Sequence, residues 1–419
     1  MLINRPEYLE KLISFKDQNL IKVVTGLRRS GKSTLFQLYI HYLKEQGVKD
    51  SQIIQINFDD PSYSFSNAKD LFDYITSQTK TTARKTYVFL DEVQMVPEFQ
   101  IAVNGLRQRD NYDVYITGSN AYLLSGELAT LLSGRYVEIH MLPLSFKEYI
   151  SGLYPDYINM DALKRKVNLR EIFMDYLNYG GLPQTLDYYE TQDGARIPIV
   201  TNIHEYLENI LSTIVYKDIM LRHNVTDKNL LERIVNFMLD NIGQPISTKK
   251  IVDTLNGNQI KVSFYTVENY ITALEECFLI YRAERYDIRG RELLATGYKY
   301  FVTDTGLRNY LLGRSAENDI GQLLENVVYL ELIRRRNKIW VGKYDNLEVD
   351  FVTNNTDETV YYQVATRASE DNTLERELTP LINIRDNYPK CLLLLDGGAN
   401  SGTSGIKVVN IIDWLLEKD

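Results

Sequence analysis

One stretch near the N-terminus, residues 20–47, restricts the possible folds of this chain more than any other. Residues 21–25 (Ile-Lys-Val-Val-Thr) are a short, mostly apolar and β-branched run, which predicts a strand buried on both faces. The next eight residues, Gly-Leu-Arg-Arg-Ser-Gly-Lys-Ser, fit the pattern G-x-x-x-x-G-K-[ST]. Apolar residues then recur at helical spacing until Gly47. This order of strand, glycine-rich turn and helix predicts an α/β fold with a phosphate-binding turn.

Each part of this turn has a physical role in holding phosphate. Its glycines let backbone N–H groups curl around phosphate oxygens, and the N-terminus of the following helix adds positive potential. We expect Lys32 to reach the β- and γ-phosphates and the Ser33 hydroxyl to bind Mg²⁺. No individual role follows for the two arginines, and a purely structural turn is the alternative. The predicted nucleotide-binding residues are Gly26, Arg28, Arg29, Ser30, Gly31, Lys32, Ser33 and Thr34.

Strands and helices alternate as far as residue 144. After a short helix at 6–14 that begins with proline, strands are predicted at 52–58, 86–90, 114–117 and 136–141, with helices at 68–78, 97–108 and 122–132. The alternation predicts a doubly wound parallel sheet, and in such a sheet the ligand lies at the carboxyl ends of the strands.

Polar residues follow the predicted strands at the positions where catalysis would take place. Asp91 closes one strand and can orient Mg²⁺, and Glu92 can orient and deprotonate an attacking water; two solvated strand-end caps are the alternative. Asn120 could contact the γ-phosphate or that water, or could be an ordinary turn residue. Arg135 could serve a neighbour's site in a ring, because phosphoryl transfer benefits from an arginine, or it could form a surface salt bridge.

Six short segments match motifs of a known family. They are Gly-Leu-Arg-Arg-Ser-Gly-Lys-Ser-Thr (26–34), Phe-Leu-Asp-Glu-Val-Gln (89–94), Thr-Gly-Ser-Asn-Ala (117–121), Leu-Ser-Gly-Arg (132–135), Leu-Ser-Phe-Lys-Glu-Tyr (144–149) and Gly-Gly-Leu-Pro (180–183). In this combination the chain resembles a large bacterial and archaeal group of AAA-superfamily ATPases, and the resemblance covers nearly the whole chain. It implies a RecA-like P-loop core, a helical lid, a winged helix and a C-terminal α/β domain related to PD-(D/E)XK nucleases.

Four domains are expected. From Ser145 to about Val225 the pattern is all-helical, and Ser247 and Ser263 occupy positions suited to the helix N-caps of a winged helix-turn-helix. The predicted domains are an ATPase core at 1–144, a helical lid at 145–226, a winged-helix-like module at 227–300 and a nuclease-like domain at 301–419.

The winged-helix-like module gives a mixed signal for nucleic acid. Its expected recognition helix, residues 264–276, carries three glutamates and neither lysine nor arginine, and those carboxylates would repel phosphate. The stretch after it is more basic, with arginines at 282, 285, 289 and 291. Packing against other domains is therefore favoured, and a backbone contact by the wing is the alternative.

The C-terminal domain is predicted to have lost cleavage chemistry. The resemblance implies a first acidic residue that binds Mg²⁺, then a second, and then an acid and a lysine two residues apart on the next strand. Glu325 and Asp350 match the first two positions. Gln363 and Ala365 stand where the acid and the lysine belong, so we expect a degenerate site in a domain kept for assembly or partner binding.

Composition narrows the class of protein. The net charge of −9 excludes a generic polyanion binder, so any nucleic-acid contact needs a local basic patch. Apolar runs are too short for a membrane span, and Cys277 and Cys391 are expected to be buried thiols in a reducing cytosol. We expect a cytoplasmic Mg²⁺-dependent ATPase that binds ATP, forms a homo-oligomer such as a ring, and uses its nucleotide state to rearrange that oligomer. A nucleotide-loaded switch or scaffold with little turnover and an ATP-gated nuclease are the alternatives.

Overall fold

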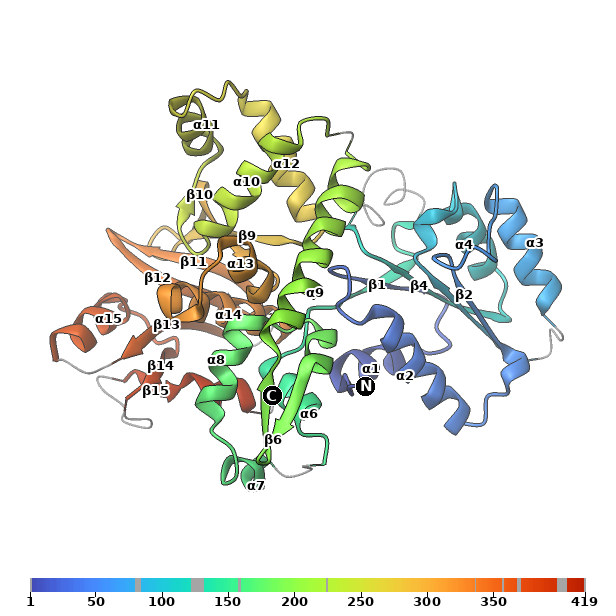
Figure 1. Ribbon diagram of the computed structural model, residues 1–419, viewed down its shortest axis with the longest axis horizontal. Helices are drawn as coiled ribbons and strands as arrows, with labels where there is room; N and C mark the ends of the chain where they lie inside the picture. Colours follow the sequence, from blue (N-terminus) through green and yellow to red (C-terminus); the bar gives the residue numbers. More distant parts are fainter. Residues whose placement is uncertain are drawn as a thin grey trace. The chain divides into compact units, whose positions relative to one another are not determined.

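The computed structural model describes residues 2–79, 84–121, 132–156, 160–223, 225–335, 337–355, 358–367, 371–397 and 405–417. The chain divides into two compact units. The first is Met1–Pro143 with Glu276–Phe278, and the second is Leu144–Glu275 with Leu279–Asp419. Figure 1 shows the elements of both units in chain order, from blue to red. Within the described ranges, no helix combines the length and the apolar character that crossing a bilayer requires.

The first unit contains a five-stranded sheet whose strands are all parallel, in the order β2-β3-β4-β1-β5. The strands are β1 (Ile21–Thr25), β2 (Ile53–Asn57), β3 (Thr86–Asp91), β4 (Tyr112–Gly118) and β5 (Tyr136–His140). The predicted α/β class with a RecA-like parallel sheet is confirmed. Residues 122–131 of the helix expected after β4 lie outside the described residues.

Helices cover both faces of this sheet (Figure 1). One apolar cluster joins α1 (Pro6–Ser14) and α2 (Lys32–Glu45) to one face, and another joins α3 (Ala68–Gln78) and α4 (Phe99–Arg107) to the other. Successive strand residues point to opposite faces, so Val23 packs in the second cluster and Val24 in the first. Both faces of the strands are therefore apolar, as a parallel sheet between two helical layers requires.

Local signals place the helices of this unit as expected. Pro6 is the first residue of α1, and the Asn67 side chain accepts a hydrogen bond of 3.0 Å from the backbone N–H of Asp70 at the start of α3. Helix α2 ends just before Gly47, whose φ of 84° lies in the left-handed region that glycine adopts without strain. Local sequence chemistry is sufficient to determine these boundaries.

The second unit begins with helices, but one part of its first segment is not helical. The helices are α6 (Phe146–Leu153), α7 (Met160–Lys164), α8 (Leu169–Tyr179) and α9 (Val200–Thr213), followed by a π-helical stretch at Ile214–Met220. The prediction of an all-helical region is wrong between α8 and α9, where β6 (Tyr189–Gln192) and β7 (Ala195–Pro198) form an antiparallel hairpin. Asp193-Gly194 is its turn, with φ of 50° and 82°, and Asp-Gly is a preferred sequence for a two-residue hairpin turn.

The rest of the second unit combines helices with an eight-stranded sheet. Ser247 and Ser263 each accept a hydrogen bond from the backbone N–H three residues on, at 3.2 and 3.1 Å, as predicted for N-caps. The helices are α10 (Lys228–Asp240), α11 (Thr248–Gly257), α12 (Phe264–Glu276), α13 (Thr305–Leu312), α14 (Ile320–Arg334), α15 (Asp371–Asn383) and α16 (Ile411–Leu416).

The sheet of the second unit has the order β15-β14-β13-β12-β11-β9-β10-β8. Its strands are β8 (Pro245–Ile246), β9 (Ile280–Asp287), β10 (Glu292–Val302), β11 (Lys338–Tyr344), β12 (Leu347–Asn354), β13 (Thr359–Arg367), β14 (Lys390–Asp396) and β15 (Lys407–Asn410). Because β10 runs through residue 300, strands from both sides of that position share one sheet.

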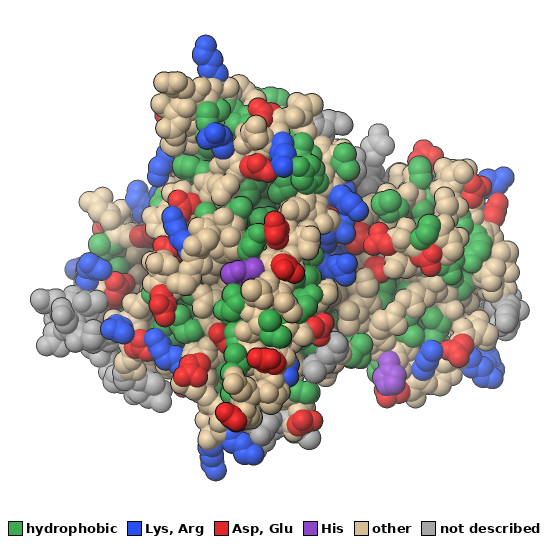
Figure 2. All heavy atoms as spheres, in the orientation of Figure 1, with side chains coloured by type: hydrophobic (Ala, Val, Ile, Leu, Met, Phe, Trp, Pro, Cys, Tyr) green, Lys and Arg blue, Asp and Glu red, His purple; other side chains and the backbone are tan. Residues whose placement is uncertain are grey.

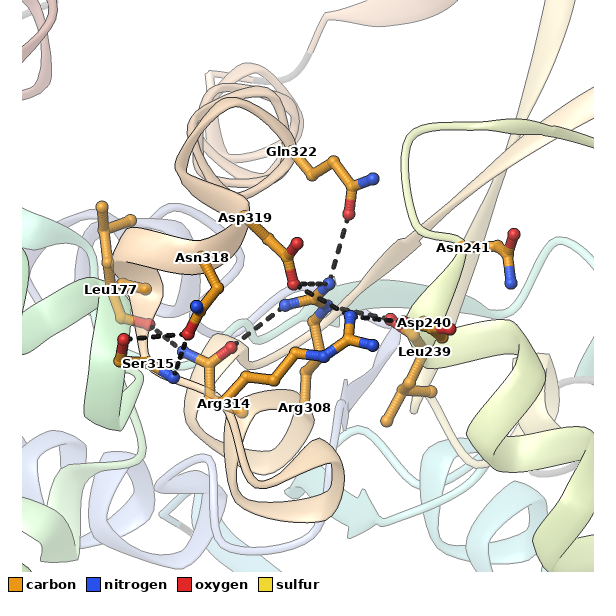
Figure 3. Close-up of polar contacts among 12 residues, drawn as sticks. Leu177, Leu239, Asp240, Asn241, Arg308, Arg314, Ser315, Asn318, Asp319 and Gln322 are labelled. Atoms are coloured by element: carbon orange, nitrogen blue, oxygen red, sulfur yellow. Dashed lines mark hydrogen bonds and ion pairs between the residues drawn. The ribbon is translucent and has the colours of Figure 1, made fainter.

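A buried arginine connects helices of the second unit that are far apart in sequence. The Arg308 side chain on α13 is 0% exposed, and its guanidinium donates to the Leu239 carbonyl oxygen at 2.8 Å and to Asp319 Oδ2 at 2.9 Å (Figure 3). It also donates to Gln322 Oε1 at 3.2 Å. Arg314 reaches the same Asp319 oxygen at 3.2 Å, but its side chain is 40% exposed. Arg308 therefore joins α10, α13 and the start of α14 through hydrogen bonds in the protein interior.

Replacing Arg308 by lysine is expected to lower the free energy of unfolding by about 2–3 kcal/mol, because one ammonium cannot reproduce the planar set of donors and leaves buried acceptors unsatisfied. Urea unfolding followed by circular dichroism measures the change. Arg314→Lys is the matched control, since it alters the same network at an exposed position and should have little effect. Equal losses in the two variants would contradict this role for Arg308.

Candidate active site

The glycine-rich turn between β1 and α2 has the backbone geometry of a phosphate loop. Gly26 and Gly31 have φ of 140° and 102°, and Arg29 has φ of 66°. A Cβ added to Gly26 would lie 2.1 Å from the Met141 carbonyl oxygen, so only glycine fits there. Arg29 is exposed and Arg28 half-buried.

The polar side chains of the loop are suited to an anion. Lys32 is 5% exposed, and its Nζ donates to the carbonyl oxygens of Gly26 and Leu27, each at 3.1 Å. Ser30 Oγ is buried, and among the described residues it has no hydrogen-bond partner. Thr34 is half-buried in the first turn of α2. A buried ammonium and an unsatisfied hydroxyl at a helix N-terminus fit the phosphates of a nucleotide.

Asp91 lies where the sequence places the magnesium ligand. It ends β3, is buried, and accepts a hydrogen bond from Thr117 Oγ1 at the end of β4. Burial raises the pKa of Asp91, and the nearby hydroxyls of Ser33 and Thr117 oppose that rise. The Ser33 hydroxyl is near enough to influence the Asp91 carboxylate, so the two predicted metal ligands are neighbours, and a hydroxyl with a carboxylate is a donor pair that suits Mg²⁺.

Glu92 is held in an unusual backbone conformation. Its φ of 57° and ψ of 44° are left-handed, which costs a non-glycine residue about 1–2 kcal/mol. The Glu92 N–H donates to Thr117 Oγ1 at 2.9 Å, and Glu92 Oε2 accepts from the Gln94 amide and from Ser119 Oγ, the latter at 3.3 Å. These contacts orient the carboxylate beside Asp91. Sequence reasoning did not single out Thr117, Gln94 or Ser119, although the segments that contain them were recognised.

The two remaining predicted catalytic residues lie at opposite ends of the strands. Asn120 is buried two residues after β4, the strand between β1 and β3, so it lies at the carboxyl edge with the phosphate loop. Arg135 precedes β5, and its carbonyl oxygen accepts from the Ile21 N–H at 2.9 Å, at the amino end of β1. The Arg135 side chain is exposed and donates to Asn104 Oδ1 at 3.4 Å. Arg135 is therefore remote from the phosphate loop of its own chain.

A histidine that the sequence did not assign lies close to the loop. Thr25 Oγ1 is 3.1 Å from His140 Nδ1 and donates to Glu138 Oε1 at 2.6 Å. Burial, with smaller contributions from the positive charges of Lys32 and Lys11, lowers the pKa of His140 to about 4. The imidazole is therefore neutral at pH 7 and adds no positive charge beside Lys32.

The second unit brings the predicted nuclease-like residues together. Glu325 lies on α14, Asp350 on β12 and Gln363 on β13. The Asp350 N–H donates to Gln363 Oε1 at 3.4 Å, and Asp350 Oδ2 accepts from the Val364 N–H at 2.8 Å. Burial raises the pKa of Asp350, and the nearby charge of Glu325 raises it further.

One member of this cluster was missed from the sequence. Lys299 on β10 is buried, and its Nζ lies 2.7 Å from Glu348 Oε1 and 3.3 Å from Glu325 Oε2. The available signal was a lysine within the strand-like run Tyr-Lys-Tyr-Phe-Val, two residues before Phe301 and so on the same face. Nothing in sequence spacing connects it to the carboxylates that it meets.

Comparison with known proteins agrees with this geometry. Residues 18–150 match the model of an AAA domain, and residues 170–318 match a domain of unknown function (DUF8612). The second match carries no statement about a nuclease. In the solved structures, the Walker-type ATPase PABY2304 of Pyrococcus abyssi aligns over 74% of this chain and 96% of its own, with a TM-score of 0.51 and 15% identity, which bears on the fold alone.

Two relatives extend over most of the chain. An uncharacterized protein of Methanocaldococcus jannaschii, MJ1544, is 29% identical over 344 residues, which are 80% of this chain and 72% of that protein. An uncharacterized protein of Haemophilus influenzae is 40% identical over 417 residues, 99% of either chain. With this full-length similarity, the matched AAA domain and the phosphate loop described above, the chain belongs to the family of AAA-domain P-loop proteins that includes the Haemophilus influenzae protein.

Proposed function

We propose that this protein is a Mg²⁺-dependent ATPase that hydrolyses ATP to ADP and phosphate. The observation that carries the proposal is the fixed Glu92 carboxylate beside the Ser33–Asp91 pair. A scaffold that only holds ATP has no need of a second, oriented carboxylate. Here one threonine, Thr117, hydrogen-bonds both Asp91 and the Glu92 backbone, so the two acidic residues have a defined relative position.

Each residue of the site has a separate role in ATP binding or hydrolysis. Lys32 leaves the Gly26 and Leu27 carbonyls to bind the β- and γ-phosphates, and loop N–H groups hold the remaining oxygens. Glu92 accepts a proton as a water attacks the γ-phosphorus, and the bond to the bridging oxygen breaks to release ADP. Asn120 lies on the same edge, and we expect it to contact the γ-phosphate or that water. When bound by Ser33 and Asp91, Mg²⁺ neutralises phosphate charge.

Steady-state phosphate release tests the proposal. Wild-type protein with ATP and Mg²⁺ should release phosphate, and EDTA should stop the release. The alternative is a nucleotide-loaded switch or scaffold, which predicts tight ATP binding with release no greater than that of a Glu92→Gln variant. That result would contradict hydrolysis and favour a nucleotide-loaded switch or scaffold as the function of the site.

A second candidate function is regulation of the ATPase by nucleic acid, and it rests on one observation about α12. Glu268 accepts from Thr248 Oγ1 at 2.6 Å, and Glu275 pairs with Arg282 at 3.2 Å, so two of the helix's three carboxylates are engaged internally. Tyr265 is 74% exposed on this helix. Exposed lysines lie nearby in sequence, at Lys249, Lys250 and Lys261.

The charge pattern limits how strong such a contact can be. On the face drawn in Figure 2, Lys and Arg side chains are interspersed with Asp and Glu side chains, without one extended basic surface. Addition of duplex DNA at low salt should therefore raise phosphate release if the lysines at 249, 250 and 261, which lie outside α12, contact the DNA backbone, and Lys261→Ala should reduce that stimulation. If DNA has no effect at any salt concentration, the module acts in packing, which the sequence favoured.

Arg135 supports a homo-oligomer in which each site is completed by a neighbour. Because Arg135 lies at the amino end of the strands, it could reach a phosphate loop only in another subunit. We propose such an assembly, a ring being one form, with nucleotide state driving its rearrangement. The expected parts are the ATPase core at 1–144, the lid at 145–226, the winged-helix-like module at 227–300 and the nuclease-like domain at 301–419. The last two share one sheet through β10, so in this proposal they move together.

Mixing two inactive variants tests the shared site. Arg135→Ala and Glu92→Gln proteins should each turn over little ATP, and their mixture should regain partial activity, because Arg135 of one subunit completes the intact Glu92 site of the other. A mixture of Lys32→Ala and Glu92→Gln is the control, since both defects lie in the same half-site and cannot complement. No rescue at any mixing ratio, with subunit exchange verified by fluorescence energy transfer, would exclude action in a neighbour.

A further inference from the structure

In the second unit, Glu325, Glu348 and Asp350 form an acidic cluster that already contains a cation, Lys299. Lys299 Nζ lies 2.7 Å from Glu348 Oε1 and 3.3 Å from Glu325 Oε2, and the Lys299 side chain is 3% exposed. Burial favours the neutral amine, but the charges of Glu325, Asp350 and Glu348 outweigh it and raise the pKa of Lys299 above its ordinary value. The contacts with Glu325 and Glu348 therefore favour the ammonium form of Lys299.

The backbone of β10 explains how Lys299 reaches carboxylates on other elements. The pairing of β10 with β9 shifts register between Leu294 and Lys299, and Gly297 within the shift has φ of 84°. This positive φ favours a glycine, whereas a Cβ there would meet only the flexible Arg285 side chain, 3.1 Å from Nη1. Strand irregularities of this kind redirect side chains, and here the redirected side chain is Lys299.

A metal-binding carboxylate site needs an opening for the ion. Lys299 hydrogen-bonds the oxygens that face it, Asp350 Oδ2 accepts a backbone N–H, and Gln363 Nε2 donates to Glu377 Oε2 at 3.4 Å. A divalent ion of the kind that nuclease-like folds use would have to displace an ammonium from a buried position. The residues present therefore do not fit that metal.

We propose that the Lys299 ammonium is the permanent cation of this cluster, taking the place of the divalent metal, so that the domain folds without metal and does not cleave phosphodiesters. The role is structural: Lys299 joins β10, β12 and α14 through Glu348 and Glu325. The proposal is independent of ATP hydrolysis, because it concerns the second unit alone and is tested without nucleotide.

Thermal unfolding of the nucleotide-free full chain with Mg²⁺, Mn²⁺ or EDTA tests this proposal. Wild-type protein should unfold at the same temperature in all three. Lys299→Met should unfold at lower temperature in EDTA, because it leaves carboxylates without a counter-ion, and Mn²⁺ should raise that temperature by roughly 5 °C. Lys338→Met, on an exposed lysine at the start of β11, is the control and should respond to no metal.

Two further measurements keep the test decisive if Lys299→Met fails to fold. Lys299→Met/Glu348→Gln removes one charge of each sign and should fold, with Mn²⁺ sensitivity smaller than that of the single variant. Purified wild-type protein incubated with single- and double-stranded DNA and RNA should leave them intact with either metal. A metal-induced stabilisation of wild type that Asp350→Asn abolishes, or cleavage that Asp350→Ala abolishes and Lys32→Ala retains, would overturn the proposal.

Discussion

Glu92→Gln is expected to lower the rate of ATP hydrolysis by about 10²–10⁴-fold while ATP still binds, because a neutral amide cannot accept the proton of the attacking water. The amide is nearly isosteric with the carboxylate, and its oxygen can still accept from Gln94 and Ser119 as Glu92 does. The phosphate loop is untouched. Phosphate release should therefore fall sharply, and the dissociation constant of a fluorescent ATP analogue should change little.

Glu98→Gln is the matched control for this prediction. Glu98 is an exposed carboxylate only six residues on, and it shares the left-handed backbone, with φ of 53°. Its neutralisation should leave hydrolysis at the wild-type rate. If Glu92→Gln hydrolysed ATP as fast as Glu98→Gln, Glu92 would not be the general base.

Lys32→Ala is expected to weaken ATP binding itself, by about 10- to 100-fold in the dissociation constant. A charge-assisted hydrogen bond to phosphate contributes about 1.5–3 kcal/mol, and tenfold in affinity corresponds to about 1.4 kcal/mol. In the structure the Lys32 ammonium donates hydrogen bonds to two carbonyl oxygens of the loop. When ATP binds, phosphate oxygens can replace these carbonyls as acceptors, so the ammonium loses no hydrogen bonds. Isothermal titration with a non-hydrolysable ATP analogue measures the loss.

A surface lysine of the same helix provides the control that distinguishes loss of the Lys32–phosphate contact from a change in net charge. Lys44 lies in the last turn of α2, 49% exposed, and pairs with Asp50 at 2.7 Å. Lys44→Ala removes the same charge at a distance from the loop and should bind ATP as the wild type does. Comparable weakening in both variants would mean that bulk electrostatics, and not Lys32, holds the phosphates.

Some features of this protein follow from the sequence alone because local chemistry determines them. Buried parallel strands are continuous apolar runs, so Ile21–Thr25 and Thr86–Asp91 could be recognised, and capping residues such as Asn67 mark helix starts. A phosphate loop is a contiguous backbone structure, and its residues from Gly26 to Thr34 are therefore predictable as one unit. The Asp193-Gly194 turn was also readable, and the hairpin was missed because its strands are only four residues each.

Contacts between residues distant in sequence were decided only by the tertiary structure. Thr117 meets Asp91 because β3 and β4 are neighbours in the sheet, and Arg135 is excluded from its own phosphate loop because β5 runs parallel to β1. The clearest case is Lys299, which reaches Glu325 and Glu348 through a register shift in β10. Sequence spacing records the period of a strand or helix, but it does not record which strands become neighbours or where a long side chain crosses between them. Those are set by the packing of the whole unit.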